Sequence, residues 1–295
     1  MHQTGQIYRP PSEASVQRLE VTIGCSHNKC SFCTMYRKTP FRVAPLEDVE
    51  MDLKELHDRG EKITRIYLTN GDPFVLGTDR LVKIAELVHQ YLPEVEVLTC
   101  YASIQNLKAK SLEDLKLLKS VGYDELYVGL ETAYAPAVKL INKGFTVEEA
   151  YENIGKLKEA GMKYSALVML GIGGKGHSKE SVEATAALLN KYPPYRVSPL
   201  STAVLRGSEL EELCNKGEYV QLTERELIEE EKMLLRALKI NDCIFFGSHP
   251  YNLITISGVL PQDREEIIKH LDSEMAAWDR DQPGFLDTVW KRTDM

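Results

Sequence analysis

The chain has 295 residues, of which 43% are hydrophobic and 27% are charged, which is ordinary for a soluble globular protein with a sizeable core. Its formal net charge of −8 gives no general attraction to a phosphate backbone, so a polynucleotide substrate is disfavoured. The first residues carry no signal-peptide pattern, and no apolar run is long enough to span a membrane, so we expect a cytoplasmic protein.

The first 16 residues are polar and carry two adjacent prolines, which predicts an irregular lead-in. After them the chain alternates β-rich segments with amphipathic helical segments. Six strands are expected at 18–24, 64–70, 94–102, 124–131, 163–172 and 195–204. Helices are expected between them at 45–60, 79–92, 111–122, 146–161 and 178–192. Ser111 and Asp114 form a capping-box start, and the helix at 146 opens in the same way.

This alternation predicts right-handed crossovers and a parallel sheet, hence an α/β fold. Six units are too few for a closed barrel of eight, so we expect a partial (βα)6 TIM-like barrel. Further helices are expected at 222–240 and 261–278, with a β-like or irregular segment between them. The expected parts are the lead-in 1–16, the barrel core 17–205 and an α/β extension 206–295 packed on the barrel.

Three of the six cysteines lie within nine residues, in the segment GCSHNKCSFC, with the spacing C-x4-C-x2-C. Thiolates are soft donors that suit iron–sulfur clusters and zinc. Three ligands leave one corner of a cubane cluster for an external molecule. A structural zinc site would need a fourth ligand, and the nearest candidate, His27, lies inside the first gap. Cys214 and Cys243 show no ligand spacing, so a second cluster is not expected.

A three-cysteine loop after the first strand of a partial barrel resembles the radical S-adenosylmethionine superfamily. The loop is similar to a mostly uncharacterised subset that reads GCSHN-x-C-x-F-C, and it departs from the usual C-x3-C-x2-C spacing by one residue. The resemblance covers about residues 18–205. It implies a [4Fe–4S] cluster on Cys25, Cys30 and Cys33, with S-adenosylmethionine as the second cofactor.

The resemblance also implies contacts to S-adenosylmethionine. Phe32 would pack on the adenine, and Asn70, Gly71 and Asp72 would take the place of the Gly-Gly-Glu turn that binds the methionine amino group. Glu131 closes the fourth strand in a stretch similar to "GLE…LKxINKGxT", in which Lys143-Gly144 reads as a helix end. Gly171 and Ile172 resemble a "GxIxG" region near the adenine. The alternatives are a core aromatic for Phe32, a turn for residues 70–72 and a solvated carboxylate for Glu131. For Gly171 and Ile172 the alternative is a phosphate-binding loop, although the ending of a Walker sequence is missing.

Other candidates come from their positions. Cys100 at the end of the third strand is a candidate hydrogen-atom donor inside the barrel, although buried cysteine often serves only as a small apolar residue. Ser103 follows the same strand and is a candidate contact to cofactor or substrate. His249, in the segment 248–252, is a candidate proton carrier because its ordinary pKa is near neutrality; the alternative is a surface histidine. The acidic run 229–231 reads as a solvated helix face.

Together these features predict an enzyme that reductively cleaves S-adenosylmethionine to methionine and a 5′-deoxyadenosyl radical. The radical would abstract hydrogen from an unidentified small-molecule substrate, with ferredoxin or flavodoxin as electron donor. Oxidation, methyl transfer and rearrangement all start from this radical, whereas methylthio transfer would need a second cluster. The alternative is a binding or delivery protein that holds an iron–sulfur cluster without radical turnover. The segment 248–252 is expected to approach the barrel mouth.

Overall fold

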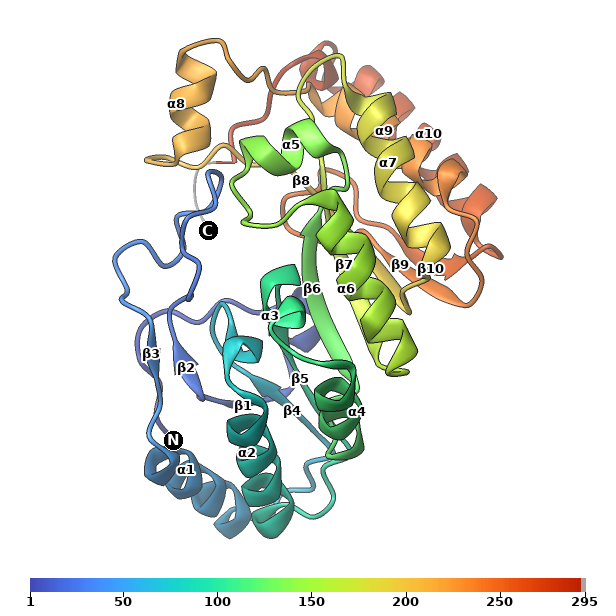
Figure 1. Cartoon of the computed structure of the whole chain (residues 1–295). Helices are drawn as coiled ribbons and strands as arrows, with labels where there is room; N and C mark the ends of the chain where they lie inside the picture. Colours follow the sequence, from blue (N-terminus) through green and yellow to red (C-terminus); the bar gives the residue numbers. More distant parts are fainter. Residues whose placement is uncertain (293–295) are drawn as a thin grey trace. The chain divides into compact units, whose positions relative to one another are not determined.

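The computed structural model describes residues 1–292 and contains two compact units (Figure 1). Unit 1 comprises residues 1–28, 35–129 and 152–164, and unit 2 comprises residues 29–34, 130–151 and the chain from 165 onward. In both units, strands and helices alternate along the chain and most neighbouring strands run parallel. The expected α/β class is therefore confirmed.

Unit 1 carries parallel strands that neighbour one another in chain order: β1 (Gln17–Leu19), β4 (Arg65–Leu68), β5 (Val97–Ala102) and β6 (Glu125–Glu131), whose last two residues belong to unit 2. Its helices are α1 (Leu46–Asp58), α2 (Thr78–Tyr91), α3 (Ile104–Lys108) and α4 (Leu112–Ser120). The apolar face of α2 is buried, because Leu81, Ile84, Ala85 and Val88 all point into the core. The short strands β2 (Thr22–Ile23) and β3 (Arg42–Val43) pair on either side of the cysteine loop.

Unit 2 carries β7 (Lys163–Leu170), which begins in unit 1, followed by β8 (Arg196–Ser201), β9 (Cys243–Phe246) and β10 (Ser257–Leu260). The first three are parallel, and β10 runs antiparallel to β9. Its helices are α5 (Ala135–Leu140), α7 (Ser178–Lys191), α8 (Glu209–Asn215), α9 (Glu224–Ala237) and α10 (Arg264–Asp281), and α6 (Val147–Glu159) begins in it. Because β9 pairs with β8, the segment after residue 205 supplies a strand of the sheet itself. The three-part division expected from the sequence stays a prediction.

The six predicted strands are all present, although the first is interrupted after Leu19 and continues as β2. The capping box predicted at Ser111 is formed, with its amide donating to Asp114 Oδ2 at 2.8 Å. The equivalent pair at the start of α6 is formed by Thr146 and Glu149. Helices α3, α5 and α8 were not expected, because five to seven residues are too few to show a helical period.

The lead-in is more ordered than predicted. It contains a short 3-10 helix, η1 (Pro11–Glu13), and the Glu13 side chain is buried. One carboxylate oxygen of Glu13 lies 2.7 Å from Arg65 Nη2 and accepts a hydrogen bond of 2.5 Å from the Tyr127 hydroxyl. Burial lowers the pKa of Arg65, but Glu13 and Glu125 outweigh this effect and raise it. The lead-in is therefore tied to β4 by an ion pair whose carboxylate is buried.

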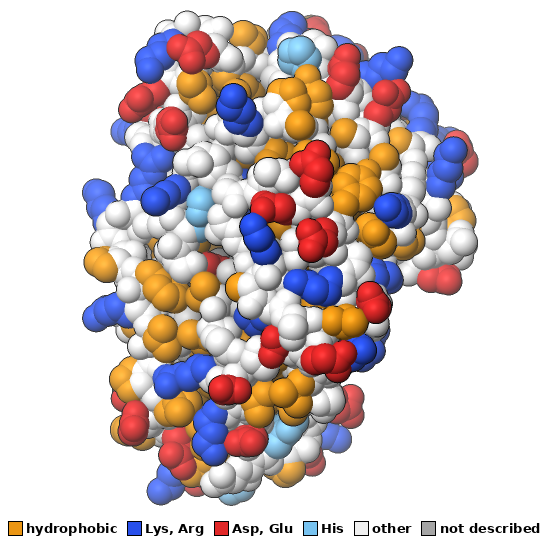
Figure 2. Space-filling view, in the orientation of Figure 1, with side chains coloured by type: hydrophobic (Ala, Val, Ile, Leu, Met, Phe, Trp, Pro, Cys, Tyr) orange, Lys and Arg blue, Asp and Glu red, His pale blue; other side chains and the backbone are white. Residues whose placement is uncertain are grey.

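Acidic and basic side chains are interspersed over the face seen in Figure 2, where no broad patch of one sign gathers. Such mixing is usual for a protein surface that carries a modest net charge. Within residues 1–292, none of the helices combines the length and apolar character needed to cross a bilayer.

Candidate functional site

The first cysteine lies in unit 1, against the turn that follows β4. The Gly71 amide donates to the Gly24 carbonyl at 3.0 Å, which ties this turn to the start of the cysteine loop. A Cβ atom on Gly71 would lie 3.0 Å from Cys25 Cβ and 2.7 Å from Tyr36 Cε2. Real Cβ atoms do not approach this closely, so glycine at this position is required by the packing of the cysteine loop. The sequence argument had attributed this glycine to the approach of a ligand.

Polar acceptors flank Gly71 on both sides. Asn70 has a left-handed backbone (φ 80°), and its Nδ2 donates to the Thr22 carbonyl at 2.7 Å. Its Oδ1 atom is buried and has no hydrogen-bond partner among the described residues. Asp72 is also buried, and its carboxylate accepts a hydrogen bond from the Ser26 hydroxyl. An acceptor buried without a partner is costly, so this turn favours a ligand that carries a hydrogen-bond donor.

The other two cysteines lie in unit 2, on a short segment held at its central residue. The Ser31 amide donates to the Ile141 carbonyl at 3.0 Å, and its hydroxyl donates to the Leu140 carbonyl at 3.0 Å. The Ser31 carbonyl in turn accepts from the Leu210 amide at 2.9 Å. Cys30 and Cys33 flank this serine and are both half-buried. The backbone that carries them is thus fixed by three hydrogen bonds, whatever the two thiols bind.

Glu131 and Lys143 form a buried ion pair beside these cysteines. Lys143 Nζ lies 2.5 Å from Glu131 Oε1 and 5.6 Å from the centroid of the Phe32 ring. Burial lowers the pKa of Lys143, but Glu131, Cys30 and Cys33 together raise it above its ordinary value. The amine therefore stays charged next to two thiols. The sequence interpretation of Lys143 as part of a helix end missed this role, although its place in the stretch that resembles "INKG" was a usable signal.

Phe32 and Ile172 pack in one apolar group of unit 2. Ile172 is fully buried in this group with Ile141 and Leu210, and Phe32 packs against it while remaining partly exposed. The Ile172 side chain therefore has a structural role. Phe32 packs against the core as the plainer interpretation predicts, and its contact with the adenine stays a prediction.

The turn after β7 is held by residues far along the chain. Gly171, with φ 80°, donates its amide to Glu230 Oε1 at 2.7 Å and accepts a hydrogen bond of 2.7 Å from the Tyr219 hydroxyl. The second Glu230 oxygen accepts from the Ser178 hydroxyl at 2.5 Å. The prediction of a solvated acidic face is wrong for Glu230 and Glu231, which are 2% and 3% exposed, because α9 packs against α7.

We expect the variant Glu230→Ala to lower the free energy of unfolding by about 1–3 kcal/mol, because it leaves the buried Gly171 amide without its acceptor. The matched control Glu229→Ala, one residue earlier on an exposed part of α9, should change it by less than about 0.5 kcal/mol. Urea denaturation followed by circular dichroism measures both values. Equal stabilities of the two variants would show that Glu230 does not support the turn.

Two of the sequence-predicted candidates, Cys100 and Ser103, have structural roles that the structure shows. In the parallel register, Cys100 lies beside Leu68 and Leu126, and all three are fully buried on one face of the sheet. Side chains alternate along a strand, so Tyr101 points to the opposite face, where it contacts the ring of Tyr67. Burial raises the pKa of the Cys100 thiol. Packing among apolar side chains is the role that the structure shows for Cys100, and hydrogen-atom donation stays a prediction.

Ser103 is the N-cap of α3, and its hydroxyl accepts a hydrogen bond of 3.2 Å from the Asn106 amide. This capping bond gives the serine a sufficient structural reason to be present. Whether Ser103 also contacts cofactor or substrate stays a prediction.

His249 is half-buried, and its Nδ1 atom lies 3.1 Å from the Tyr251 amide, from which it accepts a hydrogen bond. Burial lowers the pKa of this imidazole to about 4. Burial thus disfavours the charged form of the ring, and the role of His249 as a proton carrier stays a prediction. The segment itself is anchored at the carboxyl end of β8, where Asn252 Oδ1 accepts from the Ser201 amide at 2.8 Å.

Among residues 1–292, no three His, Cys, Asp or Glu side chains are grouped so as to hold a single metal ion. The donor set offered by Cys25, Cys30 and Cys33 is nevertheless chemically distinctive. All three are half-buried, they come from one loop, and their thiolates are the donors that iron–sulfur clusters require.

Comparison with known proteins also points to a family that uses an iron–sulfur cluster. The family model described as the radical SAM superfamily matches residues 19–189. An uncharacterized protein of Methanocaldococcus jannaschii is 27% identical over 220 residues, which cover 71% of this chain and 67% of that protein. The chain spans only 22% and 46% of the length of two tRNA uridine(34) acetyltransferases that it also matches, from M. jannaschii and Methanocaldococcus infernus.

Solved structures with the same fold include methylornithine synthase, at a TM-score of 0.55 and 16% identity, covering 88% of this chain and 81% of that one. They also include the methyltransferase TsrM of Kitasatospora setae, with cobalamin and a [4Fe–4S] cluster bound. Its TM-score is 0.51 at 19% identity, and the match covers 63% of this chain and 36% of that one. The expected partial TIM-like barrel fold is thereby confirmed.

Proposed function

Because the chain belongs to the radical S-adenosylmethionine superfamily, we propose that it is an enzyme that reductively cleaves S-adenosylmethionine and abstracts hydrogen from a small-molecule substrate. Members of this superfamily are enzymes that use a [4Fe–4S] cluster and S-adenosylmethionine. The observation that carries the proposal is the buried pair of Glu131 and Lys143 beside Cys30 and Cys33. A protein that merely stores a cluster has no need of a fixed charge pair next to it.

The thiolates of Cys25, Cys30 and Cys33 would hold the cluster, since they are soft donors from one loop. The chemistry that the cluster would supply is the transfer of one electron, from a donor such as ferredoxin or flavodoxin, to S-adenosylmethionine, whose C–S bond would break to give methionine and a 5′-deoxyadenosyl radical. We do not infer a tRNA substrate from the acetyltransferase relatives, because this chain spans less than half of their length. A small molecule suits the acidic net charge better.

Polar side chains of each unit suit one of the two charged groups on the methionine part of S-adenosylmethionine. In unit 1, Asp72 and the Asn70 Oδ1 atom would accept hydrogen bonds from an ammonium group. In unit 2, Lys143 would attract a carboxylate, and Glu131 holds the amine in position. Phe32 would offer a flat apolar surface to an aromatic base. These residues would therefore bind and orient S-adenosylmethionine, while their burial keeps water away from the charged contacts.

The test of the proposal is product formation. Anaerobically reconstituted protein should release 5′-deoxyadenosine when it is mixed with dithionite and S-adenosylmethionine, and chromatography with mass detection measures the product. Protein that carries a full cluster, binds S-adenosylmethionine and yet releases none of this product would support the alternative of a cluster-holding protein.

We expect Asp72→Ala to weaken S-adenosylmethionine binding about ten- to hundredfold, because one charged hydrogen bond contributes about 1.5–3 kcal/mol. The cluster should be retained, since Asp72 lies on the strand-end turn and not on the cysteine loop. Calorimetry with the reconstituted protein measures the affinity, and iron analysis checks the cluster. Asp58→Ala, an exposed carboxylate at the end of α1, is the matched control and should bind as wild type does. Unchanged affinity in Asp72→Ala would remove this residue from the site.

A further inference from the structure

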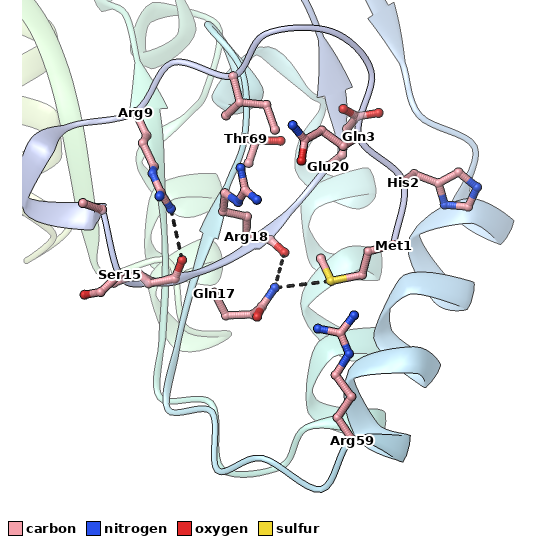
Figure 3. A pocket seen from close by; sticks show the side chains of 13 residues that line it. Met1, His2, Gln3, Arg9, Ser15, Gln17, Arg18, Glu20, Arg59 and Thr69 are labelled. Atoms are coloured by element: carbon pink, nitrogen blue, oxygen red, sulfur yellow. Dashed lines mark hydrogen bonds between the residues drawn. The ribbon is translucent and has the colours of Figure 1, made fainter.

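A polar pocket of about 410 Å³ lies in unit 1, between the lead-in and β1 (Figure 3). Its lining combines residues of the lead-in with residues of β1, of α1's C-terminal end and of the strand-end segment after β4. The polar and charged residues of the lining include Arg9, Gln17, Arg18, Glu20, Arg59 and Thr69.

The pocket residue Arg18 points to the same face of the sheet as Tyr67 of the neighbouring strand. Arg18 lies opposite Tyr67 in the parallel register, whereas the next residue, Leu19, points to the other face and is fully buried. Thr69, which also lines the pocket, is two residues before Gly71. Two residues of extended chain span about 7 Å, so the Thr69 edge of the pocket is about that far from Gly71, in the turn that carries Asp72.

Positive charge dominates the polar lining, because three arginines share the pocket with one glutamate. The Glu20 carboxylate is already engaged, since its two oxygens accept from the Thr4 amide at 2.8 Å and from the Thr4 hydroxyl at 2.9 Å. Arg59 forms an ion pair with Glu55 on α1. Neither Glu20 nor Glu55 therefore neutralises the charges of Arg9 and Arg18 in the pocket.

Arg18 has neither a hydrogen bond from its guanidinium nor an ion pair within residues 1–292. The Arg9 guanidinium donates one long hydrogen bond, of 3.4 Å, to the Val16 carbonyl. Burial, followed by the nearby charge of Arg18, lowers the pKa of Arg9. Figure 3 shows both side chains extending into the pocket, Arg9 from the lead-in and Arg18 from β1. Two like charges that share a cavity favour a bound anion between them.

We propose that this pocket binds the anionic group of the small-molecule substrate, a carboxylate or a phosphate, between Arg9 and Arg18. That the ligand is the substrate rests on the proposed function. The guanidinium group presents a planar set of donors that matches both carboxylate and phosphate oxygens, so one pocket suits either chemistry. Arg9 belongs to the lead-in, and the ion pair of Glu13 and Arg65 helps to hold this segment against the pocket.

Calorimetric titration of the full chain with inorganic phosphate and, separately, with succinate tests the inference. At least one probe should bind to wild type, and Arg18→Gln should weaken its binding tenfold or more, because a charged hydrogen bond is lost. Arg18→Lys should retain part of the affinity, since it keeps the charge but not the planar donors. Arg42→Gln, which removes an exposed arginine of unit 1, should bind as wild type does. Preference for phosphate or for succinate identifies the substrate's acidic group.

Failure of both probes to bind wild type would overturn the inference, as would equal affinities in wild type and Arg18→Gln. An equal loss in Arg42→Gln would show a general charge effect and would overturn it too. Circular dichroism confirms that each variant is folded. Dithionite-driven release of 5′-deoxyadenosine should be unchanged in Arg42→Gln. If wild type releases none, the proposed function fails on its own, whereas the anion site is judged by calorimetry alone.

Discussion

Cys30→Ala is expected to abolish the iron–sulfur cluster, whereas wild type reconstituted without oxygen should carry about four irons and four sulfides per chain. Removing one of three thiolates from a loop leaves too few ligands to hold a cubane. Iron and sulfide analysis, with the visible absorption of the cluster, measures the effect. Full iron content in Cys30→Ala would refute the assignment of the cysteine loop.

Cys214→Ala is the matched control for this experiment. Cys214 is also half-buried, but it packs against the apolar group of unit 2 that includes Ile172 and Leu210. Its replacement should leave iron content unchanged. Loss of iron in Cys214→Ala as well would mean that the cluster depends on the fold of unit 2 and not on a particular thiolate.

The variant Lys143→Met should combine a large loss of stability with a large loss of cofactor binding. It leaves the Glu131 carboxylate buried without its partner, and breaking a buried ion pair costs about 3–5 kcal/mol. Removal of the amine should also weaken S-adenosylmethionine binding at least about tenfold, because a charged hydrogen bond to the cofactor would be lost. Urea denaturation measures the first effect, and calorimetry with reconstituted protein measures the second.

The double variant Lys143→Met with Glu131→Gln separates these two effects. It removes both charges, so most of the stability should return, because no uncompensated charge remains buried. Binding of S-adenosylmethionine should stay weak, because the amine is still missing. If the double variant binds as tightly as wild type, Lys143 serves only the fold, and the proposed contact to the cofactor is wrong.

The C-terminal segment does more than extend the barrel core. It supplies β9, which pairs with β8, and it holds both backbone groups of Gly171 through Glu230 and Tyr219. Glu230 of α9 therefore supports a strand-end turn of the kind at which α/β enzymes bind their ligands.

The strands, a helix cap and the cysteine loop could be predicted from the sequence, because each depends on residues that are close together in the chain. The alternation of β-rich and amphipathic segments predicts all six strands, because the period of buried side chains is a property of neighbouring residues. Capping at Ser111 depends on two residues three positions apart, and the spacing of Cys25, Cys30 and Cys33 lies within nine residues. By the same reasoning the sequence alone indicates the superfamily and its cofactors, which the match over residues 19–189 confirms.

Only the tertiary structure decided which charges are buried and what they contact. Glu230 and Gly171 are 59 positions apart, and Glu13 reaches Arg65 across 52 positions, so no local pattern contains either pair. The pKa of His249 is lowered by burial, which depends on what packs over the ring, whereas its sequence neighbours leave that packing open. The neighbours of Cys100 are likewise set by pairing between strands, which places it beside Leu68 and Leu126. Hydration of a charged or polar side chain is a property of the packed fold, and it lies beyond what residue type and spacing specify.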